Sequence, residues 1–128
     1  MTTCRGVIVR DHTKLRAFEL ADQLALMVYK ATRCLPRQEQ YGLTAQMRRA
    51  AVSVASNIVE GCARSTQAEY VRFLDIAYGS AREVEYQLSL AHRLDYMTTA
   101  QYASLRAQAI ETSKVLGALI RSLRGDRL

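Results

Sequence analysis

Residues 66–94 read TQAEYVRFLDIAYGSAREVEYQLSLAHRL, and this segment carries the clearest structural signal in the chain. It begins with Thr66-Gln67-Ala68-Glu69, a capping box in which the hydroxyl binds the third helical amide and the carboxylate reaches back. Mostly apolar residues then recur at intervals of three and four, namely Tyr70, Leu74, Ala77, Ala81, Val84, Leu88 and Ala91. This spacing predicts a helix from Thr66 to about Leu94, in which close packing explains the glycine of Gly79-Ser80.

The segment that follows has the same organisation. Thr98-Thr99-Ala100-Gln101 is a second capping box. The three-four repeat then continues toward the C-terminus through Tyr102, Leu105, Ala109, Thr112, Leu116, Leu119 and Leu123. The pattern predicts another long amphipathic helix.

Two earlier segments complete the helical set. The first runs from about Thr13 to Cys34, because Pro36 disfavours helical backbone at Leu35. Its expected core positions are Ala17, Leu20, Leu24, Met27, Ala31 and Cys34. The second covers about Gln38 to Ala63, with an irregularity expected at Gly42. Its expected core positions are Leu43, Met47, Ala50, Val54, Ile58 and Gly61.

These segments predict an all-α protein. A single proline and six glycines in 128 residues leave few turn-forming residues, which argues against the many short strands of a sandwich or barrel. The length fits one domain, residues 1–128. Short connections between long helices favour an antiparallel up-down-up-down four-helix bundle. Residues 1–12 are expected to form an N-terminal extension outside it.

The charge of the chain indicates the kind of partner. Eighteen basic and twelve acidic residues give a net charge of +6, and fifteen of the basic residues are arginine. Guanidinium groups bind phosphate or carboxylate through two parallel hydrogen bonds, so this excess favours a polyanion or an acidic protein. A generic basic surface is the alternative. The longest apolar run, residues 24–29, is far too short to span a bilayer, and we expect a soluble cytoplasmic protein.

A basic surface is predicted on the last helix. Its cations fall within about 80° of arc on a helical wheel. They are Arg106, Lys114, Arg121 and Arg124. With Arg16 and Arg48, this face is expected to bind a nucleic-acid phosphate backbone with little sequence preference and a steep salt dependence.

The second helix carries two further stripes besides its core face. Small apolar residues at heptad-like spacing predict a self-association surface, and they are Ala45, Val52, Val59 and Ala63. Wide burial within one closed bundle is the alternative for this stripe. A polar ladder lies beside it, and its members are Gln46, Arg49, Ser53, Asn57 and Glu60. Because no histidine or nucleophile–base pair accompanies the ladder, we interpret it as a structural hydrogen-bonded layer between helices or subunits.

Nothing in the sequence marks an enzyme. His12 and His92 lack the Glu-x-x-His spacing of carboxylate-bridged metal bundles. Three cysteines, Cys4, Cys34 and Cys62, are widely spaced and suggest neither a zinc site nor a disulfide framework. Phosphate-binding and nucleophile-elbow glycine motifs are absent. We therefore expect no catalytic residues, no metal and no cofactor.

Residues 35–94 also carry a family pattern. Residues 35–53 read LPRQEQYGLTAQMRRAAVS, followed by Asn57-Ile58-Val59-Glu60-Gly61 and by Tyr70 to Gly79-Ser80 and Glu83. The pattern resembles the four-helix-bundle family of proteins encoded in intervening sequences of large-subunit ribosomal RNA genes. That family includes the accessory variability determinant of diversity-generating retroelements. The absence of tryptophan and the basic charge make the chain most similar to this second branch.

The resemblance implies a homopentameric barrel as the assembled state. For the accessory branch it implies a bacterial or phage-encoded protein that binds RNA or DNA and the retroelement's reverse transcriptase. An intervening-sequence protein, with a role in RNA binding or assembly, is the alternative function. Neither reading involves a membrane.

Overall fold

The computed structural model describes residues 10–125, and every regular element in that range is helical. Four long helices are present: α1 (Arg16–Thr32), α2 (Leu43–Cys62), α3 (Gln67–Arg93) and α4 (Thr99–Arg124). Two short 3-10 turns, η1 (His12–Lys14) and η2 (Arg37–Glu39), precede α1 and α2. The predicted all-α class with four helices is confirmed.

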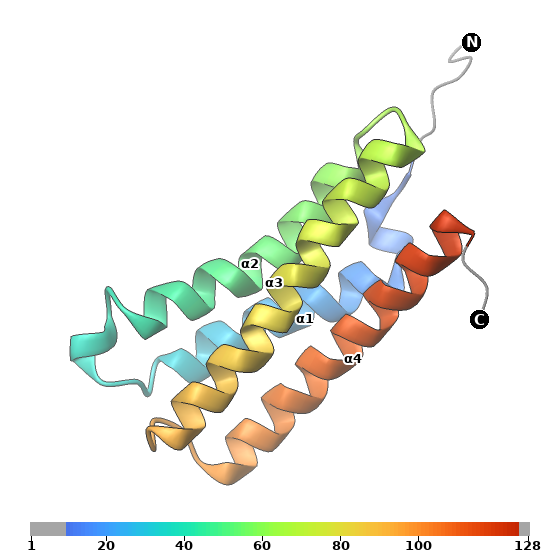
Figure 1. Ribbon diagram of the computed structural model, residues 1–128. Coiled ribbons are helices and arrows are strands. Elements are labelled where there is room, and N and C mark those ends of the chain that lie inside the picture. Colours follow the sequence, from blue (N-terminus) through green and yellow to red (C-terminus); the bar gives the residue numbers. More distant parts are fainter. Residues whose placement is uncertain (1–9, 126–128) are drawn as a thin grey trace.

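The helices are arranged as a bundle around one elongated core. Both α1 and α3 pack against α2 and α4, so every helix has two neighbours. Figure 1 shows that the chain reverses direction at each connection and that the long helices lie side by side. The core is built from two clusters of buried side chains, one at each end of the bundle.

The starts of α1 and α2 differ from the predicted boundaries. The Asp11 carboxylate accepts from the Thr13 amide at 3.0 Å and caps η1, while Leu15 is extended, so α1 begins three residues later than expected. Before α2, the chain forms η2 and then leaves helical geometry at Gly42 (φ −109°, ψ −114°). The expected irregularity at Gly42 is therefore the true start of this helix rather than a defect within it.

The boundaries of α3 and α4 agree with the prediction because their caps form. Thr66 Oγ1 accepts from the Glu69 amide at 3.2 Å, but the reciprocal bond from the Thr66 amide to the Glu69 carboxylate, expected from the capping box, is not formed. Thr98 and Gln101 complete a reciprocal capping box, with hydrogen bonds of 3.1 and 2.9 Å. The first amides of a helix have no acceptor within the helix, and a side chain that accepts from them fixes where the helix begins.

Burial follows the predicted repeat on α3, where all seven predicted positions are buried. On α1 the buried face moves to Val28 and Thr32, leaving Met27 and Ala31 half-buried and Cys34 exposed beyond the helix. The reason is geometric: a straight helix has 3.6 residues per turn, so a strict three-four repeat drifts around its surface. Smaller departures occur elsewhere, where four predicted positions are only half-buried, namely Leu43, Tyr102, Leu119 and Leu123.

Two helical glycines play opposite roles. At Gly61 a Cβ atom would lie 3.0 Å from Phe73 Cβ and 3.3 Å from the Tyr70 carbonyl oxygen, so α2 and α3 approach closely there. At Gly79 a Cβ would meet nothing within 4 Å, and the residue is exposed. The expectation that close packing explains Gly79 is wrong, because the residue lies on the outward side of α3.

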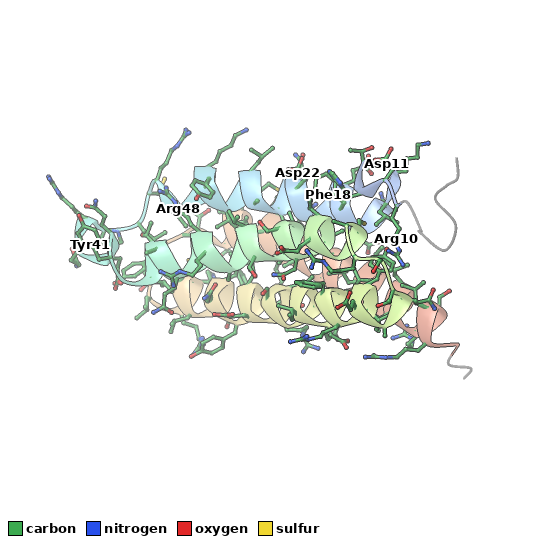
Figure 2. The ribbon with its side chains drawn as sticks, turned by 90° about the horizontal axis from the view of Figure 1, so that it is seen from above. Arg10, Asp11, Phe18, Asp22, Tyr41 and Arg48 are labelled. Carbon is green, nitrogen blue, oxygen red and sulfur yellow. The ribbon has the colours of Figure 1, made fainter. Side chains whose placement is uncertain are left out.

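The chain just before η1 is held against the bundle by one arginine. Arg10 donates from Nη1 to the Arg64 carbonyl oxygen at 2.8 Å, and its guanidinium lies 4.1 Å from the centre of the Tyr70 ring. Burial raises the pKa of Tyr70 to about 12. Figure 2 shows Arg10 and Asp11 at this end of the molecule. Residues 1–9, most of the predicted extension, lie outside the described residues.

At the opposite end of the bundle, Glu39 links the start of α2 to the segment between α3 and α4. Its carboxylate accepts from the Leu43 amide at 3.0 Å and from the Tyr96 hydroxyl at 2.9 Å. These two hydrogen bonds, the amide first, lower the pKa of Glu39 below its ordinary value of 4.5.

A depressed folded-state pKa gives a stabilisation that is present above the unfolded-state value and is lost as pH falls through the folded-state value. Glu39→Gln should therefore lower the free energy of unfolding at pH 7 and have a smaller effect at an acid pH well below 4.5. Urea unfolding of both proteins at the two pH values measures this difference. A deficit of equal size at both pH values would contradict the role given to the charge.

Candidate nucleic-acid interface

A basic groove of about 570 Å³ lies between α3 and α4. Tyr78, Arg82 and Glu85 recur along one side of α3, and Lys114, Gly117 and Arg121 recur along the facing side of α4. Ile110 and Ser113 complete the lining. The two helices thus bring three cations and one aromatic ring into a single concave surface.

The acid in this groove is already engaged within the protein. Glu85 Oε2 accepts from Ser113 Oγ at 2.5 Å and lies 3.5 Å from Arg82 Nε. Arg82 also donates to the Tyr78 hydroxyl at 3.2 Å, and this hydrogen bond, with Glu85, raises the pKa of Arg82. Lys114 and Arg121 form no ion pair with any residue in the range 10–125. Their charges are available to an anionic ligand.

The structure brings together only part of the predicted phosphate surface. Lys114 and Arg121 share the groove, whereas Arg124 pairs with Asp75 of α3 and lines a neighbouring hollow. Arg106 is exposed on α4. Arg16, at the start of α1, forms an exposed ion pair with Glu19 at 3.4 Å.

Arg48 lies on the other side of the bundle, between α1 and α2, where Figure 2 labels it. Its Nε donates to Thr32 Oγ1 at 2.9 Å and its Nη2 to the Tyr29 carbonyl oxygen at 3.4 Å. The guanidinium also lies 4.6 Å from the centre of the Tyr29 ring. Arg48 therefore joins α2 to the C-terminal end of α1 and does not contribute to the α3/α4 groove.

Sequence reasoning missed Tyr78 and Arg82. Residues 65–95 carry a net negative charge, which directed attention away from the cations of this helix. A helical wheel places Tyr78, Arg82 and Glu85 within about 60° of one another and would have found the shared side of α3.

The polar ladder of α2 is divided between two environments. Asn57 Nδ2 donates to the Ser53 carbonyl oxygen at 2.8 Å and to Ser53 Oγ at 2.9 Å. Ser53 Oγ also lies 2.9 Å from Ser80 Oγ on α3, so this part of the ladder joins the two helices. The buried Gln87 side chain donates to the backbone carbonyl of Gln46 at 3.4 Å, so this bond does not involve the Gln46 side chain. Gln46, Arg49 and Glu60 are exposed.

The two parts of the ladder should respond differently to mutation. Asn57→Ala removes the two hydrogen bonds that Asn57 donates to Ser53 within α2, beside the contact between Ser53 and Ser80 of α3, and should lower the free energy of unfolding by about 1 kcal/mol or more. Glu60→Gln removes only an exposed ion pair with Arg64 and should change it by less than about 0.5 kcal/mol. Urea unfolding of the two variants compares them. Equal effects would contradict a structural role for the Asn57 side chain.

The small apolar stripe of α2 is open to solvent on the single chain. Val52 and Val59 are 40% and 37% exposed, Ala63 is exposed and Ala45 is half-buried. Leu26 and Tyr29 on neighbouring α1 are also exposed, at 52% and 42%. The wide burial considered for this stripe within one bundle does not occur.

The described residues hold no group of three or more His, Cys, Asp and Glu side chains able to bind a metal ion. Cys34 is exposed, whereas Cys62 is buried and burial raises its pKa. Cys4 lies outside the described range. None of the helices described is long and apolar enough to cross a membrane.

These features define a four-helix-bundle protein with a basic groove between α3 and α4. Residues 13–118 match the family of 23S rRNA-intervening sequence proteins, and the chain belongs to that family. A solved protein of unknown function from the S23 ribosomal protein family of Bacteroides thetaiotaomicron is 28% identical, with a TM-score of 0.74. The match covers 82% of this chain and 98% of that one. A search of curated proteins finds no match.

The family resemblance drawn from residues 35–94 is thereby confirmed. The closer likeness to the accessory variability determinant stays a prediction.

Proposed function

We propose that this chain is a non-enzymatic RNA-binding protein that holds the phosphate backbone in the α3/α4 groove. The observation that carries the proposal is the convergence of Lys114 and Arg121, which form no ion pair with a described residue, on a groove whose acid, Glu85, is paired with Arg82 and Ser113. Such a site attracts a polyanion, in keeping with a net charge of +6.

The nature of the polyanion is inferred from the family. Its name refers to 23S ribosomal RNA, which favours RNA as the ligand and favours the intervening-sequence reading of the two functions considered. A reverse transcriptase as partner, and DNA as ligand, stay predictions of the accessory-protein reading. A reverse transcriptase gene and a variable-repeat target gene beside this one would support that second reading. A cytoplasmic location is part of both.

The proposal is tested by salt-dependent RNA binding. A fluorescein-labelled RNA hairpin with a single-stranded tail is titrated with the protein, and fluorescence anisotropy is measured from roughly 50 to 200 mM salt. The logarithm of the association constant should fall linearly with the logarithm of the salt concentration, by about 0.7 to 0.9 for each phosphate neutralised. Absence of binding at low salt, or binding insensitive to salt, would overturn the proposal.

For the assembled state we propose a cyclic homo-oligomer, with the pentamer as the expected number, built from antiparallel bundles through the small apolar stripe of α2. Exposed Val52 and Val59 support this surface. A closed ring repeats the α3/α4 groove once per subunit, and several weak sites on one particle bind an extended polyanion more tightly than one site does.

Val52→Glu should dissociate this assembly, because a carboxylate at the centre of an apolar interface would lose its hydration. Light scattering should then give the mass of a single 14.4-kDa chain with an unchanged helical circular dichroism spectrum. Ala118→Glu, which adds the same charge at an exposed position of α4, is the matched control and should leave the assembly intact. A wild-type monomer at micromolar concentration would contradict the proposed assembly.

A further inference from the structure

Tyr78 places an aromatic ring in the α3/α4 groove, which phosphate binding by charge alone does not require. Its side chain packs against the core from one side and lines the groove on the other. Its hydroxyl accepts a hydrogen bond from Arg82 Nη1 at 3.2 Å. The groove therefore has an aromatic wall beside its cations.

The half-buried Tyr78 ring also differs from three other aromatic rings of the described residues in having no arginine stacked on it. Arg10, Arg48 and Arg64 lie over Tyr70, Tyr29 and Phe73, at 4.1, 4.6 and 5.2 Å from the ring centres. No such arginine covers Tyr78 within residues 10–125. The part of the Tyr78 ring that lines the groove is therefore not occupied by a cation–π contact with an arginine of the described residues.

Gly117 keeps the space beside the ring empty. A Cβ atom there would lie 3.5 Å from Tyr78 Cε1 and 3.4 Å from Arg121 Nη1. Both are ordinary contacts, so packing within the chain does not require a glycine at this position. A glycine inside a helix costs about 1 kcal/mol relative to alanine. The consequence of having one here is an opening flanked by an aromatic ring and a guanidinium.

We propose that this groove takes one unpaired nucleotide of the RNA, with its base stacked on Tyr78 and its phosphate between Lys114 and Arg121. The inference rests on the proposed function and adds to it a preference for single-stranded over duplex RNA. A volume of about 570 Å³ is within the range of small-ligand sites, and aromatic stacking is how proteins hold unpaired bases. Bases within a duplex are already stacked and cannot enter.

The experiment compares two fluorescein-labelled RNAs, a single strand of about ten nucleotides and a duplex of the same length. Tyr78→Leu should weaken binding of the single strand about tenfold and binding of the duplex less than twofold, because only the unpaired base loses its stacking partner. Tyr78→Phe retains the ring and should bind like the wild type. Gly117→Leu fills the opening, keeps every cation and should reproduce the selective loss.

Circular dichroism shows which variants are folded, and Gly117→Leu tests the proposal even if Tyr78→Leu does not fold. Equal losses for the two RNAs, or no loss for either, would overturn base stacking. Failure of the proposed function has a different signature, in which the wild type binds neither RNA, or in which Lys114→Gln with Arg121→Gln weakens neither.

Discussion

Gly61→Leu is expected to destabilise the bundle by about 3 kcal/mol or more, which is a large part of the stability of a domain of this size. A Cβ atom at this position would lie 3.0 Å from Phe73 Cβ, 3.2 Å from Tyr70 Cδ1 and 3.3 Å from the Tyr70 carbonyl oxygen. Neither a Cβ atom nor a backbone oxygen can move away without shifting α3. Thermal unfolding followed by circular dichroism should show a fall in Tm of about 10 °C or more.

Gly79→Leu is the matched control, because the same substitution is made at a helical glycine whose surroundings are open. Leucine is a better helix former than glycine by somewhat less than 1 kcal/mol, so Gly79→Leu should leave Tm unchanged or raise it. If the two variants lost the same stability, close approach of α2 and α3 at Gly61 would not be the cause.

Much of the fold follows from local signals in the sequence. On α3 and α4, a threonine cap and a sustained apolar repeat both indicate the same helix. Both helices begin within one residue of the predicted start. Pro36 correctly separates α1 from α2. These signals work because capping and one-sided burial are properties of residues close together in the chain.

The departures arise where structure depends on distant contacts or on particular backbone angles. The start of α2 is set by Gly42 together with Glu39 and Tyr96, and Tyr96 lies 57 residues from Glu39 in the chain. A three-four repeat also does not show which of its members are buried, because the buried face drifts around the helix. On α1, for example, Val28 is buried in place of Met27. Gly79 could be placed on the outward side of α3 only once its neighbours were known.

Only part of the candidate site could be predicted, because the rest depends on contacts between helices. Lys114 and Arg121 belong to one helix, and their shared side could be found by counting residues. That Arg82 and Tyr78 face them, that Arg124 is paired with Asp75, and that Arg48 lies with α1 are all contacts between helices. Single-helix periodicity contains no information on which helix lies opposite.

Lys114→Gln with Arg121→Gln is expected to weaken RNA binding about tenfold or more near 100 mM salt, because each lost charge removes a charge-assisted phosphate contact. Fold and assembly should be unchanged, since neither side chain forms an ion pair with a described residue. Lys30→Gln with Arg37→Gln removes one lysine and one arginine from exposed positions elsewhere and is the matched control. Anisotropy titrations at one salt concentration compare the three proteins.

The slope of the logarithm of the association constant against the logarithm of the salt concentration tests the RNA-binding groove most directly. For Lys114→Gln with Arg121→Gln, its magnitude should fall by about 1.5 relative to the wild type, as two phosphate contacts are lost. For Lys30→Gln with Arg37→Gln, it should stay close to the wild-type value. Equal slopes for all three proteins, or a larger change in the control than in the groove variant, would contradict the assignment of the α3/α4 groove as the RNA-binding site.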